Sequence, residues 1–182
     1  MTMCSHCILQ LMRDNPTLRG MTSQTQNDQD TQTALSVSRA ILAGDWATLD
    51  GLLAPEFVYH GDLGTPYSRD EYIGFMQGMK GAMSDMTMDF THTVAENGLV
   101  SVRFVTHARH TGAFMGAPAT NKPVEIRGIF VRRIQDGKVV EEFQATDLLW
   151  MMTQMGAGTL FGYWIGVGVL HKSAAIPARI DV

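Results

Sequence analysis

MTMDFTHTVAENGLVSVRFVTHARHT, residues Met86–Thr111, decides the fold of this chain. Apolar and polar residues alternate along both halves, which is the period of a β-strand with one buried face. Between the halves, Glu96-Asn97-Gly98 is a typical hairpin turn. The stretch therefore predicts two antiparallel strands. The inward set of the first is Met86, Met88, Phe90, His92 and Val94, and that of the second is Val100, Val102, Phe104, Thr106, Ala108 and His110.

Two further strands are expected downstream, over 124–134 and 138–146, joined by the tight turn Asp136-Gly137. Upstream, apolar periodicity predicts helices over 31–44, 46–54 and 69–83 and a short strand over 57–60. Ser68 and Glu71 form a capping box at the start of the third helix. Helices that precede an antiparallel sheet favour an α+β fold, and a strongly twisted sheet covered on one face forms a cone with a pocket.

The ends of the chain differ in character from its middle. The run Thr22–Thr33 is polar and cannot bury a core, so we expect a flexible N-terminal leader over residues 1–30. The folded domain is expected over 31–157, followed by an apolar C-terminal extension over 158–182. Its segment Leu160–Leu170 is apolar enough to be expected against a sheet face or a partner.

The composition of the chain limits the classes of function that are possible. The chain has 182 residues, 45% of them hydrophobic, which suits one soluble domain. A net charge of -4 without a basic run argues against a nucleic-acid partner, and no apolar stretch is long enough for a membrane span. Cys4 and Cys7 are the only cysteines, which excludes a disulfide framework and fits a cytoplasmic protein. With no second cysteine pair, we expect no zinc site.

Three histidines are candidates for the concave face of the sheet: His60, His92 and His110. An imidazole that points inward among apolar residues costs free energy unless it finds a hydrogen-bond partner. Each is therefore either a satisfied core histidine or a polar contact to a ligand.

Asp147 follows the last predicted strand, on the parity of Val139, Phe143 and Ala145. Placed inward at the pocket end of the strand, its carboxyl would be desolvated, which raises a carboxyl pKa toward the range useful for general acid/base catalysis. Alternatively, Asp147 caps the helix expected from Leu148 to Met155. Spacing alone leaves both roles open.

Several motifs together resemble one family. These are HTGAFMGAPATNKPV at His110–Val124, then Arg133, DGKVVE at Asp136–Glu141, Asp147-Leu-Leu and VYHG at Val58–Gly61. The combination is similar to the SnoaL-like polyketide cyclases, or ester cyclases, of the NTF2-like superfamily, over about residues 32–157. The resemblance implies a cone with a deep apolar pocket, a homodimer, and no metal or cofactor. It also implies an intramolecular aldol condensation that closes a ring of an aromatic polyketide methyl ester.

The resemblance also implies roles for particular residues. Asp147 matches the acid/base aspartate of the family, and His110 matches the histidine of its HTG motif, as a hydrogen-bond donor or partner of that acid/base group. We expect the hydrophobic substrate to meet His60, His92, Phe104, Tyr59 and Phe143. Asn121 and Phe143 stand where the family favours Gly and Trp, so the pocket shape, and with it the substrate, is left open.

Two other classes of function stay open. An epoxide hydrolase needs an Asp-Arg-Asp set, for which Arg127 and Arg132 are available, and a ketosteroid isomerase needs an Asp base opposite a donor such as Tyr59 or Tyr72. A non-catalytic small-molecule-binding module would leave the histidines and Asp147 in structural roles.

Overall fold

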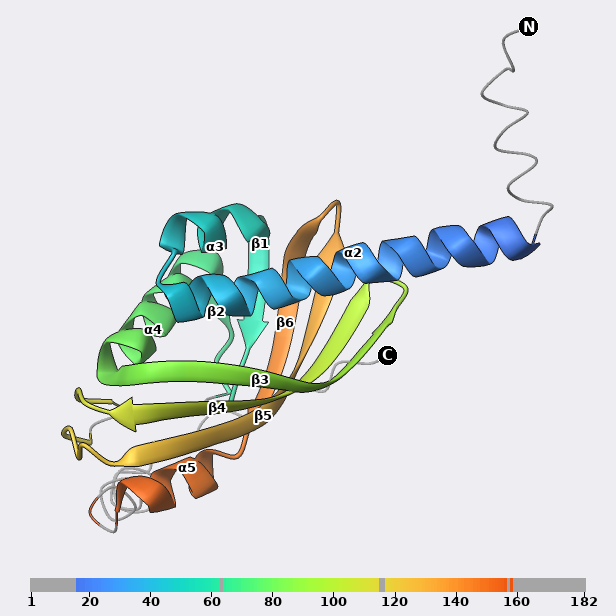
Figure 1. Ribbon diagram of the computed structural model, residues 1–182. Helices are drawn as coiled ribbons and strands as arrows, with labels where there is room; N and C mark the ends of the chain where they lie inside the picture. The colour runs from blue at the N-terminus through green and yellow to red at the C-terminus, as the bar shows by residue number, and fades with distance from the viewer. Residues whose placement is uncertain (1–15, 63, 115–116, 157, 159–182) are drawn as a thin grey trace, which may run out of the picture.

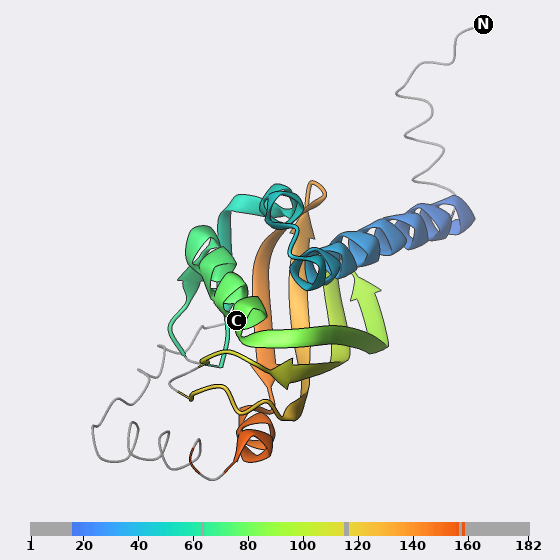
Figure 2. The ribbon, with the colours of Figure 1, turned by 60° about the vertical axis from the view of Figure 1, so that its left-hand side comes forward.

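The computed structural model describes residues 16–62, 64–114, 117–156 and 158, and of residues 16–22 it describes the backbone alone. Its elements run in the order α2 (Pro16–Ala43), α3 (Trp46–Leu52), β1 (Leu53–His60), β2 (Tyr67–Ser68), α4 (Arg69–Ala82), β3 (Met83–Glu96), β4 (Leu99–His110), β5 (Pro123–Gln135), β6 (Lys138–Thr146) and α5 (Leu148–Met155). The strands form a curved sheet with α2, α3 and α4 on its concave side (Figures 1 and 2). The predicted α+β cone is confirmed.

The strand order is β2-β1-β6-β5-β4-β3. Both predicted hairpins are present, and Asn97-Gly98 and Asp136-Gly137 all have positive φ, as two-residue turns of this kind require. The pairing differs from the prediction at one point, because β1 lies parallel to β6. A parallel pair needs a long connection, and most of the chain lies between these two strands.

Helix α2 begins earlier than the sequence predicts, at Pro16 rather than residue 31. Extending a helix that already exists adds one backbone hydrogen bond per residue, so a polar segment can continue it without packing. Residues 23–29 are mostly exposed, and the packed part begins at Asp30. From there, buried residues recur every three or four positions and lie across β3, β4, β5 and β6. Along the described chain, no helix is both long and apolar enough to cross a membrane.

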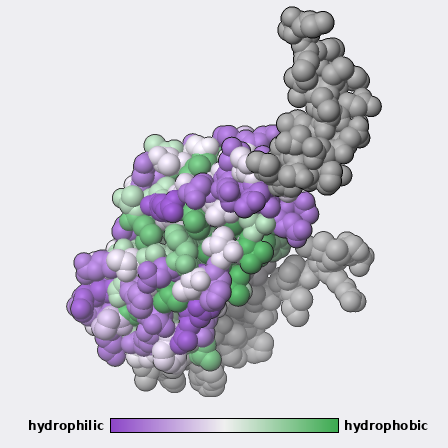
Figure 3. Space-filling view, turned by 45° about the vertical axis from the view of Figure 1, so that its right-hand side comes forward, coloured by the Kyte–Doolittle hydropathy of each residue, from purple (hydrophilic) through white to green (hydrophobic). Residues whose placement is uncertain are grey.

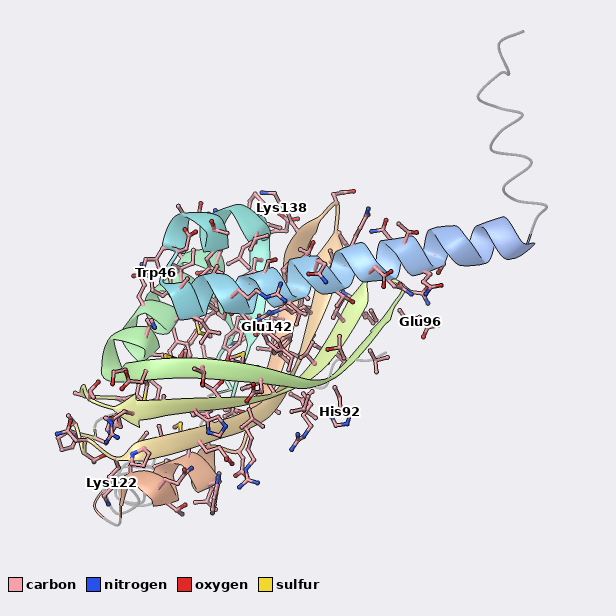
Figure 4. All side chains as sticks on the ribbon, in the orientation of Figure 1. Trp46, His92, Glu96, Lys122, Lys138 and Glu142 are labelled. Atoms are coloured by element: carbon pink, nitrogen blue, oxygen red, sulfur yellow. The ribbon has the colours of Figure 1, made fainter. Side chains whose placement is uncertain are left out.

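A β-bulge changes which side chains of β3 face the core. Phe90 pairs with Phe104 but His92 pairs with Arg103, so Thr91 is an extra residue. The Thr91 hydroxyl accepts a 3.0 Å hydrogen bond from Nη1 of Arg103 and lies 3.1 Å from its carbonyl oxygen. One extra residue reverses the alternation. His92 is therefore exposed on the outer side of the sheet (Figure 4), and the prediction that it points inward was wrong.

A second bulge does the same in β6. Arg132 pairs with Glu142 and Ile134 pairs with Val139, which leaves Val140 as the extra residue. The inward set beyond the bulge is Glu142, Gln144 and Thr146, whereas the sequence predicted Phe143, Ala145 and Asp147. Phe143 is instead 40% exposed on the outer face, so its predicted inward position was wrong.

A buried ion pair lies where α2 and α4 meet the sheet. Arg132 of β5 is 2% exposed and Glu142 of β6 is fully buried, with 2.7 Å between Nε of the first and Oε2 of the second. Nη1 of Arg132 donates to the Ala34 carbonyl and to the Ser38 hydroxyl of α2. The Tyr72 hydroxyl of α4 donates to Oε2 of Glu142 over 3.3 Å. The pair therefore joins two strands and two helices, with Glu142 between α2 and the sheet (Figure 4).

Replacing one partner of this pair should be costly. Arg132→Met leaves Glu142 buried without a counter-charge, so we expect the free energy of unfolding to fall by about 3–5 kcal/mol in urea titrations. Arg132→Met/Glu142→Gln should regain most of that loss, because no unpaired charge remains. Arg133→Met, which breaks the exposed pair with Glu141, should change the value by less than about 1 kcal/mol. Equal losses for Arg132→Met and Arg133→Met would contradict this account.

Candidate functional site

A cavity lies between the concave face of the sheet and the helices. Its apolar walls carry five methionines (Met76, Met79, Met86, Met88 and Met151) and seven aromatic residues (Tyr59, Tyr67, Tyr72, Phe75, Phe104, Phe114 and Phe130). Flexible methionines adapt to the shape of an apolar ligand. The cavity volume is about 100 Å³. This is more space than a single water needs, so the cavity is large enough to take a ligand.

Tyr59, one of the predicted substrate-binding residues, lines this cavity within an aromatic cluster. Its ring centroid lies 4.9 Å from that of Tyr72 and 5.9 Å from that of Tyr67. Burial, together with the charge of Glu142, raises the Tyr59 pKa, so its hydroxyl keeps its proton. Gly61 makes room for this ring, because a Cβ there would lie 2.4 Å from the tyrosine oxygen.

Phe104, the other aromatic residue predicted for the pocket, also lines the cavity. Its ring lies over Gly128 of the neighbouring strand, where a Cβ would come within 3.0 Å of the ring and 2.5 Å of the Ala145 carbonyl oxygen. The ring centroid is 5.8 Å from that of Phe130. A glycine on β5 thus allows two phenylalanines to form the floor of the cavity.

The polar side chains of the cavity occur at separate places in its wall. Arg132, Ser38 and Tyr72 are grouped where α2 and α4 cross the sheet. Thr106 is buried in the wall, and its hydroxyl has no hydrogen-bond partner among the described residues. An unpartnered buried hydroxyl costs free energy and is available to a ligand.

The exposed end of the cavity carries a carboxylate. Asp62 is exposed, lines the cavity, and its Oδ1 accepts a 2.9 Å hydrogen bond from the Thr146 backbone. Gln144 donates to the Thr146 hydroxyl over 3.0 Å, so β6 supplies the polar groups beside it. This rim of Asp62, Gln144 and Thr146 forms the mouth of the cavity.

Asp147 caps α5. Its Oδ1 accepts a 3.1 Å hydrogen bond from the Trp150 backbone, and its Oδ2 lies 3.8 Å from Nε of Arg127. The carboxylate is half-exposed and does not line the cavity, although Thr146 and Leu148 on either side do. Of the two roles that spacing left open, capping is the one that its contacts show.

His110 is fully buried at the end of β4, as its parity predicts, but it does not line the cavity. Nδ1 lies 3.1 Å from the Thr120 hydroxyl, and Nε2 has no partner among the described residues. Burial lowers the pKa of this imidazole, which therefore favours the neutral form.

The three candidate histidines do not converge. The His60 ring stacks on Phe143 with centroids 4.4 Å apart, and its Nε2 lies 3.4 Å from Oε1 of Glu141, away from the cavity. Within the ranges that the structure describes, no group of three or more His, Cys, Asp or Glu side chains could hold a metal ion. Cys4 and Cys7 lie outside those ranges.

Sequence reasoning missed two charged residues around the cavity, Asp62 and Glu142, and named Arg132 only as a candidate for a hydrolase set. Arg132 has a sequence signal, because it shares the parity of Val124, Ile126, Phe130 and Ile134 along β5. Glu142 lies opposite it only because of the bulge at Val140. Asp62 lies in the loop after β1, where strand periodicity carries no information.

The lowered pKa of His110 predicts a pH dependence of stability. The unfolded chain binds the proton more readily than the folded protein, so stability falls as the pH drops below about 6.5. In His110→Gln the free energy of unfolding should fall less between pH 7 and 5.5, by up to about 1.4 kcal/mol per pH unit. Urea titrations at several pH values measure this difference. His92→Gln, at an exposed position, is the control; an unchanged slope in His110→Gln would refute the prediction.

Comparison with known families matches residues 32–155 to the family described as SnoaL-like polyketide cyclase. Wild-type IdmH from Streptomyces antibioticus, a "putative polyketide cyclase", is 31% identical over 70% of this chain and 99% of its own, with a TM-score of 0.64.

Two more distant structures share the fold. A "putative SnoaL-like polyketide cyclase" from Jannaschia sp. CCS1 is 21% identical over 72% of this chain and 94% of its own, with a TM-score of 0.67. AclR from Streptomyces galilaeus, a "putative hydroxylase", is 22% identical over 71% of this chain and 96% of its own, with a TM-score of 0.65. No curated protein sequence matches the chain.

Proposed function

The chain belongs to the SnoaL-like polyketide cyclase family, and we propose that it closes a ring of an aromatic polyketide ester by an intramolecular aldol-type reaction. The cavity is the observation that carries this proposal. It combines methionine and aromatic walls, which suit a flat apolar molecule, with carboxylates at or beside its mouth. The likeness to IdmH, a "putative polyketide cyclase", supports the same class of substrate.

The proposed reaction needs one acid/base group. A carboxylate removes the acidic proton from a carbon between two carbonyl groups of the substrate. The resulting enolate carbon attacks a ketone carbon of the same molecule, forming the new carbon–carbon bond, and the ketone oxygen takes up a proton. The product is an isomer of the substrate, and the substrate delocalises the negative charge itself, so the proposal invokes no cofactor.

We assign the acid/base role to Asp147, with Asp62 as the second candidate. Asp147 lies between two cavity-lining residues, and in this proposal its carboxylate releases the Trp150 N–H and turns toward the cavity. Asp62 already lines the cavity without any movement. Both carboxylates belong to the same end of the cavity, because Asp62 bonds the backbone of the residue before Asp147.

Some residues in and around the cavity also fit the alternative functions. For a hydrolase, Arg132 has a carboxylate partner in Glu142, but Glu142 does not line the cavity. For an isomerase, Tyr59 and Tyr72 both face the cavity, with Asp62 at its mouth as a base. A binding module would hold an apolar molecule with no role for either aspartate. Turnover of a polyketide ester would favour the cyclase over all three alternatives.

Asp147→Asn should lower turnover of anthraquinone-type polyketide methyl esters at least about 100-fold, because an amide cannot accept the proton. The fold should persist, because asparagine is as good a helix cap as aspartate. Ring closure changes the chromophore, so ultraviolet absorbance measures the rate, and thermal unfolding checks the fold.

Asp45→Asn is the matched control, because Asp45 caps α3 in the same way and does not line the cavity. It should keep full turnover. If Asp62→Asn loses turnover and Asp147→Asn keeps it, the base is Asp62 and our assignment is wrong. If both single variants are as active as the parent, acid/base catalysis by these carboxylates is refuted.

A homodimer and a cytoplasmic location stay predictions. Large apolar side chains are exposed at Val94, Leu99, Ile129, Phe143, Leu149 and Trp150. Figure 3 shows hydrophobic side chains at the surface between hydrophilic ones. Such residues are compatible with a second copy of the chain. The segment Leu160–Leu170, predicted to lie against a sheet face or a partner, is outside the described residues.

A further inference from the structure

We propose that Arg132 binds the anionic oxygen of the ligand, so that the oxygenated edge of the substrate lies at the inner end of the cavity. During ring closure this oxygen is that of the enolate. The inference rests on the proposed function for the identity of the oxygen, but oxyanion binding itself is testable without turnover.

The hydrogen bonds of Arg132 leave one part of its guanidinium available. Nε donates to Glu142, and the two N–H groups of Nη1 donate to the Ala34 carbonyl and the Ser38 hydroxyl. These bonds use three of the five N–H groups of a guanidinium. A side-chain hydrogen bond with Tyr72 takes up at most one more, so at least one N–H group of Nη2 has no partner among the described residues. Because Arg132 lines the cavity, a ligand oxygen there can accept from Nη2.

Of the two charged groups in the pair, the guanidinium is the one that faces the cavity. Arg132 lines the cavity, whereas Glu142 is fully buried and does not. The guanidinium is therefore the end of the pair that faces the cavity, although the charge of Glu142 still raises the pKa of the lining residues Tyr59 and Tyr72. Apolar walls keep the local dielectric low, so this end attracts an anionic oxygen more strongly than it would in water.

Arg132 also stays charged and fixed in place. Burial acts to lower its pKa, but Glu142 and Tyr72 together, through their charges and their hydrogen bonds to the guanidinium, outweigh that effect and the pKa is raised. The guanidinium carbon lies 3.9 Å from the centroid of the Phe130 ring, which supports one face of the group. Contacts from α2, β5 and β6 thus hold the cation before any ligand arrives, which is the arrangement that stabilises a developing negative charge.

Arg132 lies at a different end of the cavity from the carboxylates near its mouth. Asp62 and Asp147 belong to the end of β6 at Thr146, whereas Arg132 pairs with Glu142, four residues earlier along the strand. The base at the mouth removes a proton from a carbon near that end of the substrate. Because the enolate of an aromatic polyketide is conjugated with its rings, the negative charge delocalises to an oxygen at the other end, against Arg132.

A coloured oxyanion tests this without turnover. The probe is 1,8-dihydroxyanthraquinone, a flat tricyclic phenol whose absorbance moves to longer wavelength when the phenol ionises. Bound to the full-length protein at one equivalent, its phenol should ionise at a lower pH than in Arg132→Met/Glu142→Gln, by about one pKa unit or tenfold in the ionisation constant. The double variant removes both charges, so it avoids an unpaired buried carboxylate.

Arg133→Met/Glu141→Gln is the matched control, since it removes the neighbouring pair on the outer face of the same hairpin. It should leave the bound-probe pKa unchanged. A probe that does not bind the cavity, or one with the same pKa in all three proteins, overturns the proposal. A lowered probe pKa in a protein that turns over no polyketide ester would support the oxyanion site while rejecting the cyclase function.

Discussion

The packing of the helices on the sheet depends on the buried ion pair of Arg132 and Glu142. Its two partners lie opposite each other on β5 and β6, and its hydrogen bonds reach α2 through Ala34 and Ser38 and α4 through Tyr72. Charges taken out of water are tolerated only when each is paired. The packing of two helices on the concave face is therefore tied to one geometry of the sheet, and that geometry leaves the cavity between them.

The same pair gives the cavity its polarity. Its walls are methionine and aromatic, its inner end presents a guanidinium, and its mouth carries Asp62 and lies beside Asp147. A cation and carboxylates at different ends of an apolar space suit a reaction in which a proton leaves one place and negative charge develops at another. This division of charge is the physical basis of the proposed ring closure, and family membership supports the class of substrate.

Local signals in the sequence were sufficient for most of the fold. The hairpin turns at Asn97-Gly98 and Asp136-Gly137, the capping box at Ser68 and the span of α5 are all confirmed. Each depends on residues close together in the chain. The two bulges depend instead on contacts between strands, such as that of Thr91 with Arg103. A bulge reverses the inward parity, so His92 and Phe143 were placed on the wrong face and Glu142 was missed.

The central claim is that a flat polyketide-like molecule lies in the cavity with its oxygenated edge against Arg132. A crystal structure of the full-length protein with 1,8-dihydroxyanthraquinone tests it most directly. The account predicts the rings between the methionines of α4 and the phenylalanines of the floor, with one oxygen within about 3.2 Å of Nη2 of Arg132. A probe bound outside the cavity, or inside it with its oxygens directed away from Arg132, would contradict the account.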